Sequence, residues 1–133
     1  MDRYINICRN SDSSVSFVSC GKDARILIPN TVDANPEKHL PFVTIKGNEI
    51  VVKVGSKDHP MYPEHFIEWI YLDTVKDGQR IFLHPGDNPQ VTFTIRNDRI
   101  RAVYAYCNLH GLWMTKIKIA RPIMLDNLSN LNI

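Results

Sequence analysis

Apolar and polar residues alternate along much of this chain with a period of two. Val91, Phe93 and Ile95 are each separated by one polar residue, and Ile117 and Ile119 are separated by a lysine. Because successive side chains of a strand point to opposite faces, each such run predicts a strand that buries one side. No stretch has a convincing helical period. The pattern therefore predicts a chain built of strands.

Seven runs of strand length follow one another in the central part of the chain, and turn-forming sequences rich in Gly, Asn, Asp and Pro separate them. The runs are 42–46, 49–54, 66–73, 79–84, 90–96, 100–106 and 112–119. Short strands with turns at roughly 8–12-residue spacing are typical of immunoglobulin-like folds. The fold class that we predict is all-β: an immunoglobulin-like seven-stranded antiparallel β-sandwich with a small N-terminal β-rich extension.

The two ends of the chain differ from this central part. Residues 1–35 contain short alternating pieces between polar turns, which predicts an extension of small hairpins. Its last part, between Pro29 and Pro36, is predicted to be a linker. Residues 36–120 hold the predicted sandwich. Residues 121–133 have no clear period, and we predict a C-terminal tail.

Composition places the chain among ordinary folded proteins. With 133 residues, 44% hydrophobic and 23% charged, it is long enough for one domain with a real core and is not expected to be disordered. No apolar run is long enough to span a membrane, and the N-terminus lacks the apolar core of a signal peptide. We therefore expect a cytoplasmic protein. A net charge of +2 with scattered Lys and Arg gives no basic stripe, so neither nucleic acid nor membrane is an expected partner.

Four of the five histidines fall in loops or at strand ends, and a cysteine lies close to one of them. These residues are His39, His59, His65, His110 and Cys107. Loops at one end of a sandwich can converge, so four imidazoles and one thiolate could meet at a single point. The three cysteines are an odd number, which leaves at least one thiol for a use other than a disulfide. The set predicts a metal site.

Five donors of this kind fit a redox metal better than a structural zinc ion, which is nearly always tetrahedral. Imidazole suits iron, copper, nickel and zinc, whereas a thiolate selects softer or redox-active metals. Four equatorial nitrogens and one axial sulfur leave the sixth octahedral position open for a small ligand. Glu37 is a candidate exchangeable sixth ligand, and Lys38 could attract an anion or relay a proton. His84 has no place in this pattern and is expected to be structural or exposed.

Two other classes of protein stay open at this point. Cys107, His110 and Met114 follow a Cys-x2-His-x3-Met spacing, and with one upstream histidine they match the ligand set of a blue-copper electron carrier. This alternative leaves two upstream histidines, Glu37 and Lys38 without a role. A non-catalytic module stabilised by tetrahedral zinc would use only a subset of the same side chains.

Three stretches hold the candidate ligands: EKHLP at 37–41, VKVGSKDHPMYPEHFIEWI at 52–70 and CNLHGLW at 107–113. They closely resemble the superoxide reductases, the desulfoferrodoxin and neelaredoxin family. The resemblance covers about residues 30–114, in order and with fitting spacing. It implies an immunoglobulin-like domain that holds one mononuclear non-haem iron per chain. The ligands that it implies are His39, His59, His65, His110 and Cys107.

The resemblance also implies an activity, the one-electron reduction of superoxide to hydrogen peroxide with uptake of two protons. Cys107 would be the axial thiolate, Glu37 a mobile sixth ligand of the ferric state, and Lys38 the active-site lysine that draws in the anion. A one-electron donor, rubredoxin in much of the family, would restore the ferrous state. Members of the family form dimers or tetramers, so we expect a homodimer or homotetramer.

The N-terminal segment departs from the longer members of this family, which bind a second iron with four cysteines. Cys8 and Cys20 occupy two of those positions, whereas Ser11 and Ser19 stand at the other two. Two thiolates and two hydroxyls make a poor iron site. We therefore predict a degenerate, metal-free extension. A Cys8–Cys20 disulfide is a secondary alternative, because the expected compartment is reducing.

Overall fold

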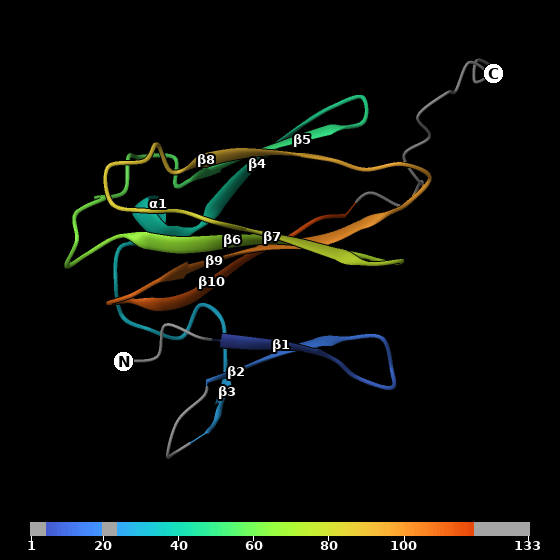
Figure 1. The fold of residues 1–133 in the computed structure, drawn as a ribbon, viewed down its shortest axis with the longest axis horizontal. Helices are drawn as coiled ribbons and strands as arrows, with labels where there is room; N and C mark the ends of the chain where they lie inside the picture. Colours follow the sequence, from blue (N-terminus) through green and yellow to red (C-terminus); the bar gives the residue numbers. More distant parts are fainter. Residues whose placement is uncertain (1–4, 20–23, 119–133) are drawn as a thin grey trace.

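The computed structural model describes residues 5–19 and 24–118, and almost all of its regular structure is β (Figure 1). Its strands are β1 (Ile5–Arg9), β2 (Val15–Ser19), β3 (Ile26–Leu27), β4 (Pro41–Lys46), β5 (Glu49–Val54), β6 (Ile67–Thr74), β7 (Gly78–Phe82), β8 (Gln90–Thr94), β9 (Ile100–Cys107) and β10 (Gly111–Lys116). A one-turn helix, α1 (Pro36–His39), precedes β4. Strands β4 to β10 correspond to the seven predicted runs, and their ends differ by a few residues.

Two antiparallel sheets form the sandwich. One has the strand order β10-β9-β6-β7 and the other has the order β4-β5-β8. Fully buried aliphatic side chains from both sheets fill the space between them, among them Ile50, Val52, Ile70, Leu72 and Val103. The predicted all-β, immunoglobulin-like antiparallel sandwich is confirmed.

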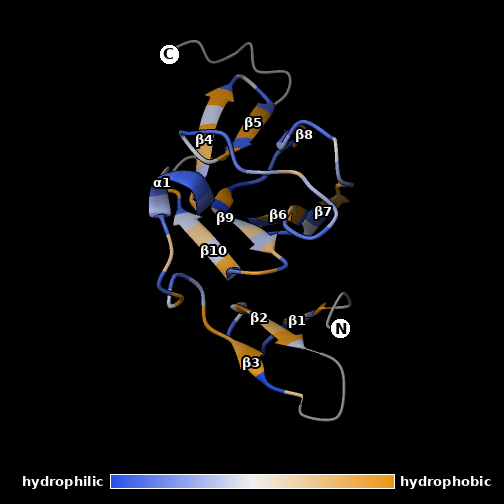
Figure 2. Cartoon of the chain, turned by 90° about the vertical axis from the view of Figure 1, so that its left-hand side faces the viewer, coloured by the Kyte–Doolittle hydropathy of each residue, from blue (hydrophilic) through white to orange (hydrophobic). Residues whose placement is uncertain are grey.

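A third sheet, with the order β1-β2-β3, covers the outer face of the four-stranded sheet and forms a separate layer in Figure 2. Trp69 and Tyr71 of β6 point to this outer face, whereas Ile70 and Leu72 point into the sandwich. The ring of Phe17 in β2 lies against both aromatic residues. Strand β6 is therefore buried on both faces.

Helix α1 is the element that the hydrophobic pattern did not predict. Four residues are too few to show a helical period. Asn35 and Pro36 favour the start of a helix here. The side-chain oxygen of Asn35 caps the helix by accepting a hydrogen bond from the backbone N–H of Glu37 at 2.9 Å, and Pro36 takes the first helical position. The helix ends at His39 and delivers that residue directly in front of β4.

Several predictions about the two ends of the chain lie at or beyond the edges of the described residues. Cys20 and the predicted tail 121–133 lie outside them. Cys8 is exposed on β1, Ser11 is exposed in the following turn, and Ser19 is buried at the end of β2. The metal-free extension and the domain boundaries therefore stay predictions. Among the described residues, no helix has the length and apolar character needed to cross a membrane.

Candidate metal centre

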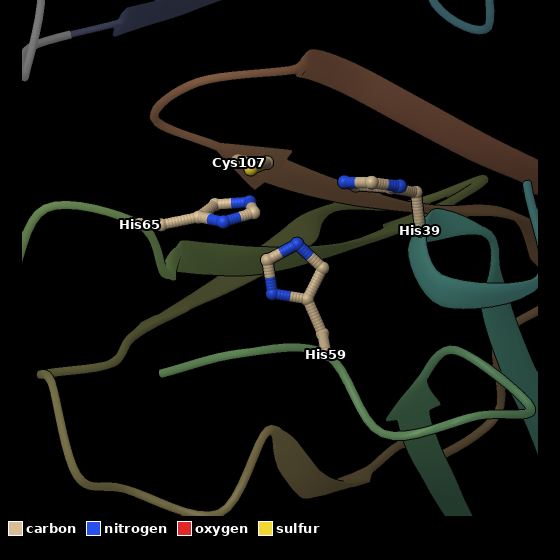
Figure 3. A group of neighbouring side chains, drawn as sticks. All are labelled: His39, His59, His65 and Cys107. Atoms are coloured by element: carbon tan, nitrogen blue, oxygen red, sulfur yellow. The ribbon is translucent and has the colours of Figure 1, made fainter. Parts of the chain in front are cut away.

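The five predicted ligand side chains come from three separate parts of the chain and gather at one end of the sandwich. His39 ends α1, while His59 and His65 lie in the connection between β5 and β6. Cys107 is the last residue of β9, and His110 lies in the turn that leads to β10. In Figure 3 the rings of His39, His59 and His65 point toward a common space beside Cys107.

The distances between these side chains suit a single metal ion. Ligand atoms of His39, His59, His65 and Cys107 all lie within 4.8 Å of one another. His110 joins them, because its Nδ1 is 3.1 Å from Nε2 of His39 and 4.0 Å from Sγ of Cys107. Metal–nitrogen bonds of about 2.0–2.1 Å allow two nitrogens at such a separation to bind one ion. The structure thus brings all five predicted residues together.

The orientation of the imidazole rings also fits a bound metal. The Nδ1–H groups of His39 and His59 donate to the carbonyl oxygens of Asn35 and Pro60, each at 2.7 Å. This fixes the tautomer and turns the lone pair of each Nε2 toward the cluster. The Nε2 atoms of His59 and His65 are buried without a hydrogen-bond partner. Leaving such atoms unpaired costs free energy, and a metal ion would satisfy them.

Residues of β10 and the preceding turn hold this side of the cluster in place. The backbone N–H of His110 donates to Sγ of Cys107 at 3.4 Å. The indole N–H of Trp113 donates to the carbonyl oxygen of His110 at 3.0 Å, and its ring stacks on His39 with centroids 4.9 Å apart. Gly111, the first residue of β10, adopts a φ of +79°, a conformation that favours glycine. The turn therefore supports the thiolate and two of the imidazoles.

The ligand set of the blue-copper alternative is not assembled. Trp113 faces the cluster, and Met114 follows it directly on β10, so the two side chains point to opposite faces of the sheet. Met114 shares its face with Leu112, which packs under the N-terminal sheet. The alternative therefore lacks its methionine and is not favoured.

Glu37 and Lys38 lie beside the cluster and are both exposed. The carboxylate of Glu37 forms an exposed ion pair with Lys57, with 3.2 Å between the oxygen and the nitrogen. Burial is the main cause that lowers the pKa of His39 and His65, and the nearby ammonium of Lys38 adds to it in both cases. The charge of Lys38 therefore disfavours the protonated forms of His39 and His65.

Gly55 fixes the position of this segment, although in the sequence it is only one of the turn-forming residues that separate the predicted runs 49–54 and 66–73. A Cβ atom at Gly55 would collide with the carbonyl oxygen of Glu37 and lie 2.7 Å from the carbonyl carbon of Lys38. The backbone N–H of Lys57 and the hydroxyl of Ser56 both donate to that same Glu37 oxygen, at 3.1 and 3.3 Å. Because the contact joins residues far apart in sequence, no local signal announces it.

Burial favours the neutral form of three of the imidazoles and of the thiol. It lowers the pKa of His39, His59 and His65, and that of His59 falls to about 4. It also raises the pKa of the Cys107 thiol, although the backbone N–H groups of His110 and Leu109 oppose this. These three imidazoles are thus neutral near pH 7 and ready to bind a cation, whereas the thiol gives up its proton when a cation binds.

The lowered pKa of His59 predicts how the stability of the metal-free protein depends on pH. Its pKa falls from 6.5 in the unfolded chain to about 4 in the folded protein, so the unfolded state binds the proton more readily. His59 alone should therefore cost about 3 kcal/mol of stability as pH falls from about 6.5 to about 4, at 1.36 kcal/mol per pKa unit. The lowered pKa values of His39 and His65 should add to this loss. Urea unfolding of metal-free protein across this range measures the loss.

Two variants test this assignment. His59→Gln should make the stability less dependent on pH between these limits, whereas His84→Gln, which alters an exposed histidine, should keep the wild-type dependence. An unchanged pH dependence in the His59 variant would show that other groups cause it.

Comparison with known proteins places the cluster in a described family. Residues 31–116 match the desulfoferrodoxin family. A desulfoferrodoxin homologue of Archaeoglobus fulgidus is 45% identical over 101 residues, which cover 74% of this chain and 78% of that protein. The desulfoferrodoxin of Clostridium acetobutylicum is 41% identical over 124 residues, which cover 87% of this chain and 98% of that protein.

A solved structure resembles the fold as well. The crystal structure of the superoxide reductase from Treponema pallidum aligns with a TM-score of 0.68 and 45% identity, and the alignment covers 73% of this chain and 82% of that one. The match to the family includes every residue of the histidine and cysteine cluster.

Proposed function

The chain belongs to the desulfoferrodoxin family, and from this premise we propose that it reduces superoxide to hydrogen peroxide at a mononuclear non-haem iron. The observation that carries the proposal is the convergence of two buried, unpartnered Nε2 atoms, those of His59 and His65, on the same point as Sγ of Cys107. No group among the described residues satisfies these nitrogens, and a metal ion would.

The chain would hold one iron through four imidazoles and one thiolate. The proposed donor atoms are Nε2 of His39, His59 and His65, Nδ1 of His110 and Sγ of Cys107. Iron bound there would supply the single electron that superoxide takes up, and two protons would complete hydrogen peroxide. The set fits iron because imidazole nitrogens suit it and a thiolate selects a redox-active metal.

Three residues of the chain have proposed roles beside the iron. The ammonium of Lys38 attracts the superoxide anion and offers a proton at Nζ. Glu37 would be an exchangeable sixth ligand of the ferric ion, although its carboxylate contacts Lys57 here. Cys107 contributes the negative sulfur donor, which the N–H of His110 steadies through its hydrogen bond.

The reaction needs a partner, because each turnover consumes one electron. We propose an external one-electron donor such as rubredoxin. A cytoplasmic location and assembly as a homodimer or homotetramer complete the proposal.

Metal analysis and stopped-flow kinetics with superoxide test it. Purified protein should contain one iron per chain. It should show a thiolate-to-iron absorption band when oxidised and lose this band when reduced. Lys38→Ala should keep the iron but react with superoxide about tenfold more slowly, because one attracting charge is lost. Lys46→Ala, at the far end of β4, removes the same charge away from the cluster and should react at the wild-type rate.

Two outcomes would contradict the proposal. One is copper at one per chain in place of iron, with no consumption of superoxide by the reduced protein. The other is zinc bound by a subset of the five residues, in which case removal of His39 or His59 leaves the metal content almost unchanged.

A further inference from the structure

Asn108 follows Cys107 directly and reaches across to the loop that carries His65. Its side-chain oxygen accepts the backbone N–H of Phe66 at 2.9 Å, and its side-chain NH2 donates to the carbonyl oxygen of Glu64 at 3.1 Å. Its own backbone N–H donates to the carbonyl oxygen of Phe66 at 3.2 Å. One residue thus holds the main chain on both sides of His65.

The position of the His65 ring depends more on the backbone than the positions of the His39 and His59 rings do. The rings of His39 and His59 are each tied by a hydrogen bond from Nδ1 to a carbonyl oxygen. Within the described part of the chain, no such bond holds the ring of His65, although its Nε2 is buried in the cluster. Two reciprocal backbone bonds with Tyr62, at 2.9 and 3.0 Å, close the loop on itself. The contacts of Asn108 attach this closed loop to the end of β9.

We propose that Asn108 is a positioning residue that sets the imidazole of His65 against the thiolate of Cys107. It acts through the backbone of residues 64–66 and does not touch the metal. Because it adjoins Cys107, a shift of the thiolate and a shift of the His65 loop are coupled. The inference rests on the proposed function, because it takes His65 and Cys107 as ligands of one ion.

Titration of the metal-free protein with Co²⁺ tests the proposal without an activity assay. Asn108→Ala should weaken Co²⁺ affinity about 10- to 100-fold, the usual effect of removing an outer-shell contact. The thiolate-to-cobalt absorption band should also shift, because the sulfur and the imidazole no longer share their original geometry. Asn88→Ala, an exposed asparagine of the β7–β8 connection, is the matched control and should leave both unchanged.

A double-mutant cycle with His65→Ala separates positioning from a general loss of structure. If Asn108 acts through His65, the double variant should bind Co²⁺ as weakly as His65→Ala alone. Additive losses, or an Asn108→Ala protein with wild-type affinity and band position, would overturn the inference. If Asn108→Ala does not fold, Asn108→Ser replaces it, because a serine side chain is too short to span both contacts, and the same losses are expected.

The wild-type titration separates this inference from the proposed function. Wild-type protein without a thiolate-to-cobalt band would overturn both, since Cys107 would then not be a ligand. A wild-type band together with an unaffected Asn108→Ala variant would overturn the positioning role alone.

Discussion

A Cys107→Ser variant should lose its iron and its thiolate absorption band while it keeps the β-sandwich. Cys107 is fully buried at the end of β9, and its side chain shares the inward face of that strand with Val103 and Ala105. Serine fits the same space, so the fold should survive. Its hydroxyl does not ionise near neutral pH, however, so the set loses its negative donor. We expect metal affinity to fall more than about 100-fold, beyond the range typical of outer-shell changes.

Metal content after purification and the visible spectrum of the oxidised protein measure this result. Cys8→Ser is the matched control, because Cys8 is exposed on β1 and should affect neither quantity. If the Cys107→Ser protein retained a sulfur-to-iron band, the sulfur ligand would have to be a residue other than Cys107. Unfolding measured by circular dichroism should show that the loss of iron does not come from a loss of structure.

The strands of the sandwich could be predicted because each carries its own signal. Alternation, as at Val91 and Phe93, reports which face of a strand is buried, and turn residues report where it ends. The packing of the N-terminal sheet had no such signal. Nothing in the sequence around Trp69 and Tyr71 indicates which element covers them, and their contact with Phe17 shows that a second core lies on the outer face of the sheet.

The candidate site could be predicted to a similar extent. The five predicted ligand side chains are recognisable by type and spacing, and the sandwich places their loops at one end. Their supporting contacts were not predictable, because each joins distant parts of the chain. Gly55 meets the backbone of Glu37, and Asn108 meets that of Glu64, although neither pair is close in sequence. Such contacts depend on the exact approach of two loops, which hydrophobic patterning does not encode.

An aromatic cluster and a partly buried ion pair are among the contacts that hold the N-terminal sheet to the sandwich. Phe17 is 2% exposed, and its ring lies 5.8 Å from that of Trp69 and 4.4 Å from that of Tyr104. Arg9 of β1 contacts the buried carboxylate of Asp73 at 3.0 Å. Burial raises the pKa of Asp73, and the hydrogen bond from Arg9 opposes this. The aromatic contact should dominate, because it removes large apolar surfaces from water.

Phe17→Ala should therefore lower the free energy of unfolding by about 3–5 kcal/mol, the usual cost of removing a buried phenylalanine. Unfolding followed by tryptophan fluorescence measures this loss of stability. The emission of the folded protein should also change, because the ring of Phe17 that stacks on Trp69 is removed. Iron content should stay at the wild-type level, since the aromatic cluster lies on the outer face of the four-stranded sheet, whereas the side chain of Cys107 packs in the core between the two sheets of the sandwich.

Phe42→Ala is the matched control for this prediction. Phe42 lies on β4 with 57% of its surface exposed, so the same substitution should change stability by less than about 1 kcal/mol. If both variants were equally stable, the N-terminal sheet would contribute little to the fold. If Phe17→Ala lost iron in proportion to its stability, the extension and the metal-binding cluster would form one cooperative unit, and the assignment of the two faces to separate roles would be wrong.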